Sequence, residues 1–158
     1  MIFKYDDFIF ENVINESMLY ITPDLEKILR KEKTIESRWY VHKKAQYQQI
    51  KEGEVIYFKE TGNPVTAKAR VSKVLFFDKL SLKKVQEILK KYGKKIGFNK
   101  ITKKNAFEKY KNKKYCTLIF LSNIEKIKSF TINKKGYGLM CAWITVKNID
   151  RIRRIDKK

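Results

Sequence analysis

The sequence predicts an α+β domain in which a mostly antiparallel, barrel-like sheet of about five to seven strands holds two or three inserted helices. Segments with the two-residue alternation of strands outnumber segments with helical spacing. The helical segments also do not alternate regularly with the strands, as they would in a doubly wound sheet. With 158 residues, of which 43% are hydrophobic, the chain has the size of one domain and can bury a core of its own.

The chain begins with an extension, a strand and a helix. Residues 1–16 hold scattered apolar positions and are expected to pack as an N-terminal extension on a domain that spans 17–147. Residues 18–21 predict a strand. Thr22-Pro23-Asp24 then offers a capping hydroxyl, a proline at the first helical position and an acid at the positive end of the helix dipole. A helix is therefore expected as far as about Lys31.

A half-buried strand is expected over residues 34–40, because apolar and polar side chains alternate there. The alternation places Glu36 and Arg38 on one face of the strand. Trp39 points to the opposite face, where we expect it to belong to the core.

Further strands alternate with turn residues along the rest of the chain. A hairpin is expected where a Thr-Gly-Asn-Pro turn separates two β-rich segments, and three strands are expected nearer the C-terminus. The predicted strands cover 55–59, 65–77, 115–121, 127–132 and 139–146. Residues 148–158 are expected to form a basic C-terminal tail.

Two helices are expected between these strands. Ser81 is placed to cap an amphipathic helix whose apolar side starts with Leu82, and Gly93 is placed to end it. A second, shorter helix is expected to run from a Thr102 cap to about Tyr110.

The charge of the chain indicates a polyanionic partner. Subtracting the 17 acidic residues from the 37 Lys and Arg leaves a net charge of +20. Such an excess attracts nucleic acid, or less often an anionic membrane. The alternative is a lysine-rich composition without function. We expect RNA or another single-stranded nucleic acid, a protein partner as a further option, and no membrane.

The basic residues concentrate in two regions. Residues 90–114 carry eleven lysines against the single acid Glu108, and lysines of this kind neutralise phosphates. Phe107 and Tyr110 are interleaved with them but stand three apart, which favours a core-facing helix side over base stacking. The residues expected to contact the nucleic-acid backbone are Lys94, Lys95, Lys103 and Lys104, with Arg151, Arg153 and Arg154 as an extension.

Several kinds of site are not favoured by the sequence. His42 is the only histidine and has no partner at metal or triad spacing, and Cys116 and Cys141 are far apart and interpreted as small core residues. Gly136-Tyr137-Gly138 lacks the rest of a phosphate-binding loop and predicts a turn. We expect no metal and no cofactor. Because no run of about 18 apolar residues occurs and cysteine use fits a reducing compartment, we expect a cytoplasmic protein.

The segment Lys33-Thr34-Ile35-Glu36-Ser37-Arg38 follows the first predicted helix, and Gly53-Glu54 precedes a strand about fifteen residues later. This arrangement resembles the ASCH family of the PUA-like superfamily, in which a helix leads into Gly-x-Lys-x-x-Glu-x-Arg and a Gly-Asp pair precedes the next strand. The resemblance covers about residues 18–130. Lys31 replaces the family glycine and Glu54 replaces the aspartate.

The resemblance implies a small β-barrel that binds nucleic acid, most of all RNA, and reads one nucleotide in a pocket around the motif. A carboxylate can accept a hydrogen bond from an exocyclic amine, and a guanidinium can bind a phosphate or a base edge as a planar fork. An ion pair on an exposed sheet face is the structural alternative. The expected pocket residues are Lys33, Thr34, Glu36 and Arg38.

The same resemblance implies a second possibility, a small hydrolase acting on a modified cytidine or on RNA. In those family members the motif lysine and a threonine three residues later are catalytic, together with a distant glutamate. Lys33 matches the lysine, Glu36 occupies the threonine position, and Glu87 is the nearest candidate for the distant acid. An adaptor that binds an acidic protein or a ribonucleoprotein is a third possibility.

Overall fold

The computed structural model describes residues 2–4, 17–21, 24–43, 50–136, 143–146 and 148–154. Within these residues, seven strands, three α-helices and one 3-10 helix follow one another along the chain. In chain order they are β1 (Ile2–Lys4), β2 (Ser17–Ile21), α1 (Leu25–Leu29), β3 (Ile35–Tyr40), β4 (Val55–Lys59), β5 (Val65–Phe77), α2 (Leu82–Ile96), α3 (Lys100–Tyr110), β6 (Tyr115–Phe130), β7 (Trp143–Val146) and η1 (Ile149–Arg151).

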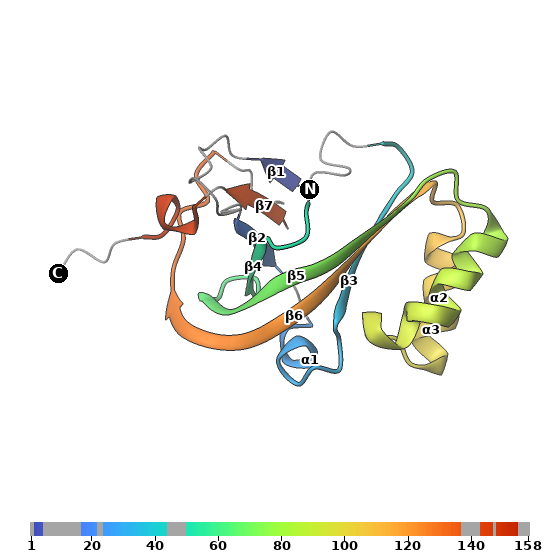
Figure 1. The fold of residues 1–158 in the computed structure, drawn as a ribbon, viewed down its shortest axis with the longest axis horizontal. Helices are drawn as coiled ribbons and strands as arrows, with labels where there is room; N and C mark the ends of the chain where they lie inside the picture. Colours follow the sequence, from blue (N-terminus) through green and yellow to red (C-terminus); the bar gives the residue numbers. More distant parts are fainter. Residues whose placement is uncertain are drawn as a thin grey trace.

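All seven strands belong to one sheet, in the order β1-β7-β2-β4-β5-β6-β3. Four of the neighbouring pairs are antiparallel, and β1–β7 and β2–β4 are parallel. The long strands β5 and β6 curl strongly, so that the sheet forms a half-barrel, and α2 and α3 lie together at one end of it (Figure 1). The predicted α+β, barrel-like fold class is confirmed.

The predicted hairpin of β4 and β5 is confirmed, with Val55 opposite Arg70 and Tyr57 opposite Lys68. The two strands predicted over 115–121 and 127–132 are in fact one strand, β6, which stays paired with β5 along its length. The residues between the two predicted strands stay in the sheet, where the register with β5 shifts between Lys68 and Arg70. The first part of the predicted strand over 139–146 lies outside the described residues, and its last part is β7.

Helices α2 and α3 differ from the prediction at their ends. Ser81 caps α2 as expected, its hydroxyl accepting from the Lys84 amide, but the helix continues through Gly93 to Ile96 and ends at Gly97, whose φ is 105°. Gly93 is buried because it faces α3, and a Cβ there would lie 2.9 Å from Cε of Lys103. Gly93 thus lies inside the helix, on the side that faces α3, and does not end it.

Two residues at helix starts were also misplaced. Leu82 is 56% exposed instead of inward, because the first turn of α2 projects beyond the core. Helix α3 begins with Asn99 as its cap, and the hydroxyl of Thr102, three residues later, completes a capping box by accepting from the Asn99 amide. Thr102 therefore supports the cap without being the cap.

Three hydrophobic clusters hold these elements, and β5 and β6 contribute to each of them. The first, around Phe58, packs β4, β5 and β6 against Leu25 and Ile28 of α1, and the second packs Ile149 and Ile152 of the C-terminal segment against Val65. The third joins α2 and α3 to the face of β3 that carries Ile35 and Trp39. Buried Cys116 and partly buried Trp39 belong to this third cluster, as their core interpretation requires. Cys141 lies outside the described residues.

Candidate functional site

The connection from α1 to β3 positions the motif. Lys31, at the place of the family glycine, has a φ of 60°, in the left-handed region that glycine adopts without strain. The turn brings the Lys33 amide to the Lys27 carbonyl at 3.0 Å. The amide of Thr34 then donates to the Lys95 carbonyl at 2.8 Å, which ties the motif to the end of α2. Backbone hydrogen bonds therefore position the motif independently of its side chains.

Lys33 lies at the centre of a buried group of charges. Its Nζ is 3.0 Å from Oε2 of Glu36 and 2.9 Å from Oδ2 of Asp24. The side chains of Lys33 and Glu36 are 7% and 5% exposed, whereas Asp24 at 34% reaches solvent. Asp24 was not predicted as a site residue; it stands at the N-cap position of α1, which was predicted for Thr22.

Burial acts to lower the pKa of Lys33, but the nearby charge of Glu36 and hydrogen bonds to Asp24 and Glu36 outweigh burial, so the pKa lies above its usual value of 10.5. Lys33 is therefore an ammonium at neutral pH. In this position it neutralises a buried carboxylate and holds α1 against β3.

Glu36 and Arg38 share one face of β3, as predicted, since they stand opposite Ile119 and Thr117 of β6. Glu36 contacts Lys33, three residues before it, and Arg38 is half-buried. Tyr110 of α3 lies within electrostatic range of this face: burial raises the pKa of its phenol, and the Glu36 carboxylate adds to the rise. Tyr110 also stacks on Trp39, with ring centroids 4.6 Å apart.

Two acids outside the motif, Glu87 as the predicted distant acid and Glu54 at the family aspartate position, differ in their surroundings. Glu87 is half-exposed on α2 and forms an ion pair with Lys84 at 3.3 Å. Glu54, at the place of the family aspartate, is fully buried where the chain enters β4, after a turn in which Gly53 has a φ of 91°. Gly53-Glu54 was part of the family resemblance, but Glu54 was not predicted as a site residue.

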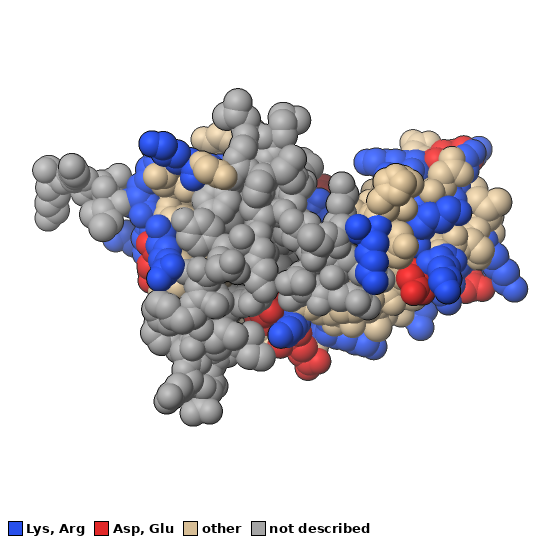
Figure 2. Space-filling view, turned by 90° about the horizontal axis from the view of Figure 1, so that it is seen from above, with Lys and Arg blue, Asp and Glu red and all other residues tan. Residues whose placement is uncertain are grey.

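A hollow of about 370 Å³ lies between α2 and α3. Apolar and polar side chains of both helices line it: Gln86, Leu89, Lys90, Lys100, Lys103, Lys104 and Phe107. Two of the predicted backbone contacts, Lys103 and Lys104, belong to the lining, and the structure adds Lys90 and Lys100. Figure 2 shows Lys and Arg gathered over this end of the molecule, with fewer acids between them.

The other predicted basic residues lie elsewhere. Lys94 and Lys95 are exposed in the last turn of α2, where their charges also favour the negative end of the helix dipole. The tail residues Arg151, Arg153 and Arg154 lie at the opposite end of the molecule from α2 and α3 (Figure 1). There the Arg153 guanidinium packs 4.0 Å from the Phe130 ring centroid. Its Nε is 3.2 Å from Asp150. The two basic regions are thus separate.

Two further observations concern the part of the chain that the structure describes. None of its helices is both long enough and apolar enough to cross a membrane. His, Cys, Asp and Glu side chains do not gather there in groups of three or more that could hold a metal ion.

The fold can be compared with known proteins. Neither a family model nor a curated protein matches the sequence. Among solved structures, the ASCH protein of Zymomonas mobilis matches with a TM-score of 0.53 and 16% identity over 73% of each chain. A variant of that protein with one serine replaced matches with a TM-score of 0.54 and 16% identity, over 75% of this chain and 76% of the other.

The chain has an ASCH-like fold. The half-barrel with its inserted helices, the positive φ of Lys31 at the glycine position and the turn at Gly53 all agree with the ASCH pattern read from the sequence. In this ASCH-like fold the helix hollow lies between α2 and α3, at one end of the half-barrel.

Proposed function

We propose that this chain is a nucleic-acid-binding domain, with RNA as the first ligand to test, that holds the polynucleotide backbone along the hollow between α2 and α3 and reads a nucleotide beside β3. The observation that carries the proposal is the hollow itself, in which four lysines surround an apolar floor. The net charge of +20 favours a polyanion over other ligands.

The hollow suits a flexible single strand. Lys90, Lys100 and Lys104 are exposed, so their ammonium groups can approach phosphates while their alkyl stems stay on the helices. Leu89 and Phe107 supply the apolar surface between them. A single strand of nucleic acid lying here would contact lysines of both helices.

Within the motif, the buried contacts separate positioning from recognition. Lys33 and Glu36 bind each other and fix the strand. Arg38 lies half-buried on the same face, and its planar guanidinium is chemically suited to a phosphate or a base edge. Arg38 is therefore the motif side chain we expect to contact a nucleotide, with the backbone of Thr34 as support.

A hydrolase in which Lys33 acts as a base is less well supported. A general base must lose its proton near neutral pH, but Asp24 and Glu36 stabilise the ammonium form of Lys33. Glu36 replaces the family threonine and is occupied by the same ion pair. We therefore place binding before catalysis.

Salt-dependent binding of the full chain to fluorescent single-stranded RNA and DNA tests the proposal. The triple variant K90Q/K100Q/K104Q removes three lysines from the hollow. If each contacts one phosphate, the slope of log Kd against log salt should fall by about 2, because each phosphate contact on a single strand contributes about 0.7. Base preference should not change.

A matched control keeps the charge change and moves it away from the hollow. The variant K126Q/K128Q/K135Q removes three lysines that are exposed on β6 and the turn after it. It should retain most of the wild-type slope. Equal losses in both variants would show a diffuse charge effect and reject the hollow as the binding site, and absence of binding at low salt would reject the function.

A further inference from the structure

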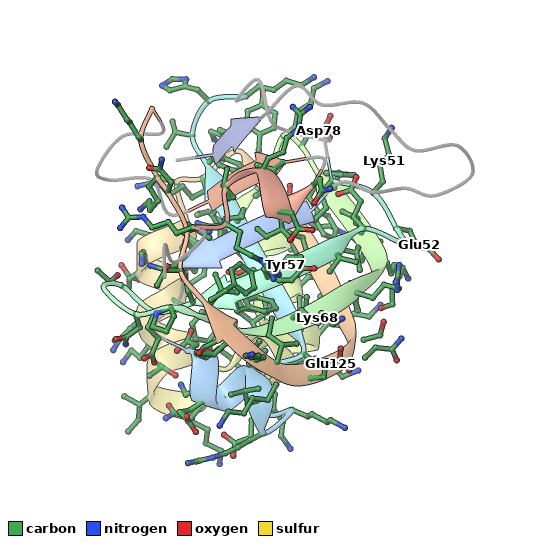
Figure 3. All side chains as sticks on the ribbon, turned by 90° about the vertical axis from the view of Figure 1, so that its left-hand side faces the viewer. Lys51, Glu52, Tyr57, Lys68, Asp78 and Glu125 are labelled. Atoms are coloured by element: carbon green, nitrogen blue, oxygen red, sulfur yellow. The ribbon has the colours of Figure 1, made fainter. Side chains whose placement is uncertain are left out.

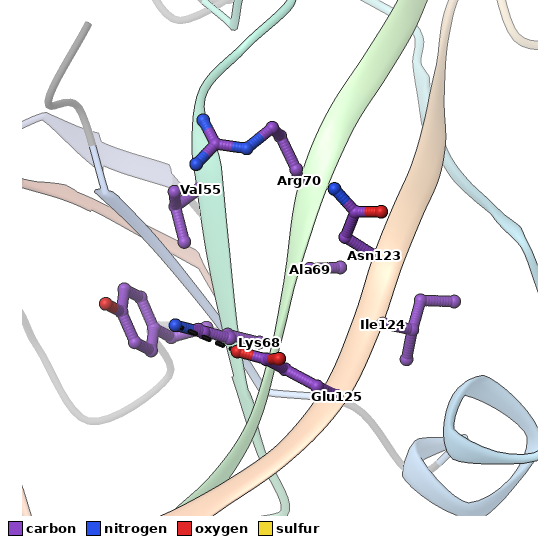
Figure 4. Close-up of a pocket in the computed structure, with 8 residues that line it drawn as sticks. Val55, Lys68, Ala69, Arg70, Asn123, Ile124 and Glu125 are labelled. Carbon is purple, nitrogen blue, oxygen red and sulfur yellow. Dashed lines mark ion pairs between the residues drawn. The ribbon is translucent and has the colours of Figure 1, made fainter. Parts of the chain in front are cut away.

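A second cavity, of about 460 Å³, lies on the β4-β5-β6 face of the sheet, away from the helix hollow. Its walls come from two alternate residues of β4, three consecutive residues of β5 and the middle of β6 (Figure 4). They are Val55, Tyr57, Lys68, Ala69, Arg70, Asn123, Ile124 and Glu125. None of these residues was predicted from the sequence to belong to a site.

The cavity arises from a bulge. Lys68 pairs with Glu125 and Arg70 pairs with Ser122, so β6 uses three residue steps where β5 uses two. The extra step contains Asn123, whose φ is 48°, a conformation that asparagine tolerates better than most residues. The bulge leaves the Asn123 carboxamide beside Arg70 at one side of the opening, as Figure 4 shows. Bulges that redirect side chains in this way are common next to binding sites.

The polar groups around the cavity are held in place. Nη1 of Arg70 donates to the Gly53 carbonyl at 2.6 Å, which uses one of the five N–H donors of the guanidinium. Lys68 forms an ion pair with Glu125 at 2.9 Å. Counting Arg70, Lys68 and Glu125, the lining carries two positive charges and one negative charge, so the formal charge is +1.

Tyr57 adds an aromatic surface to the same face. It stands opposite Lys68 across the hairpin, and Figure 3 shows Tyr57, Lys68 and Glu125 close together on this side of the molecule. An edge contact with Phe130, at 6.0 Å between ring centroids, orients its ring. The cavity therefore combines a fixed aromatic ring, an amide, a carboxylate and two cations.

We propose that this cavity binds a single nucleotide, with the base against Tyr57 and its edge on Asn123 or Glu125, and the phosphate at Arg70 and Lys68. Aromatic rings stack bases, amide and carboxylate groups bind base edges, and cations bind phosphate. The volume exceeds what a phosphate alone would fill. The nucleotide is either a free mononucleotide or one unit of a bound polynucleotide chain, and the proposal does not depend on the helix hollow.

Calorimetric titration of the full chain with the four ribonucleoside monophosphates tests the proposal, beside inorganic phosphate and the four nucleosides as separate probes. At least one monophosphate should bind tenfold or more tightly than both phosphate and its own nucleoside. Tyr57→Leu should weaken this binding by about tenfold or more, because a stacking ring is lost. Asn123→Gly should weaken it while keeping the bulge, since glycine accepts a positive φ.

Matched variants make the result specific to the cavity. Lys68→Gln and Lys73→Gln remove the same charge from β5, but only Lys68 lines the cavity, so only the first should weaken monophosphate binding. K90Q/K100Q/K104Q should leave it unchanged even if oligonucleotide binding falls. Competition by an RNA oligonucleotide would assign the site to a polynucleotide unit, and its absence to a free nucleotide. Equal affinity for phosphate and monophosphate would overturn the proposal. So would the absence of binding at a monophosphate concentration of about 1 mM, which is the order of a weak Kd.

Discussion

Replacing Lys33 by methionine tests the buried charge group directly. The substitution keeps an unbranched side chain of similar length but removes the cation 3.0 Å from Glu36, whose side chain is 5% exposed. Removing one partner of a buried ion pair costs about 3–5 kcal/mol, because the remaining charge loses its partner without regaining water. For a chain of this size the loss corresponds to a fall in Tm of roughly 6–20 °C.

The measurement is urea denaturation of the wild type, Lys33→Met and the double variant K33M/E36M. The double variant should be more stable than Lys33→Met by at least about 1 kcal/mol, since it removes the stranded carboxylate as well. Lys27→Met is the matched control: Lys27 lies 3.9 Å from Asp24 but is 49% exposed, so its loss should cost about 1 kcal/mol or less. If Lys33→Met and Lys27→Met lose the same stability, the buried pair has no special role.

Three further outcomes are expected. Gly93→Ala should raise the unfolding free energy by about 0.5 kcal/mol, because alanine favours the helix and the flexible end of Lys103 can move aside. Gly97→Ala should lower the unfolding free energy by about 1–2 kcal/mol, because alanine is strained at a φ of 105°. Thermal unfolding measures both changes, and a shift of Tm in the same direction for both variants would contradict the two predictions. Lys31→Gly should stabilise by about 0.5–1 kcal/mol in the same assay, and a loss would refute strain at that turn. Since folding raises the pKa of Lys33, the stabilisation that the Lys33 ammonium provides is complete below pH 10.5 and is lost as the pH rises through the folded pKa. By urea denaturation, the wild type should therefore lose more stability than Lys33→Met between pH 9 and about pH 12. Parallel curves of stability against pH for the two proteins would exclude this linkage.

Local pattern was sufficient for most strands. The alternation in β3 correctly separated Glu36 and Arg38 from Trp39, and the turn residues before β5 correctly marked the hairpin. These features depend on neighbours in the sequence. For the same reason Ser81 was correctly identified as a cap.

Features that depend on distant contacts were missed or misread. Gly93 was interpreted as a helix end because the approach of Lys103 from α3 leaves no trace in the local sequence. The partner of Glu36 proved to be Lys33, joined by Asp24 from the preceding helix, since the turn at Lys31 folds the chain back on itself. The cavity at Asn123 follows from a shift in strand register, which composition and periodicity do not report.

The two longest strands connect every part of the core. Residues of β5 and β6 enter all three hydrophobic clusters, from Val65 at the C-terminal segment to Phe77 beside the helices. Unfolding of one cluster therefore disrupts the pairing of β5 with β6, on which the other two clusters also depend. Slow amide hydrogen exchange along β5 and β6 should accordingly proceed through one global opening, so that a perturbation at either end of the molecule is registered at the other.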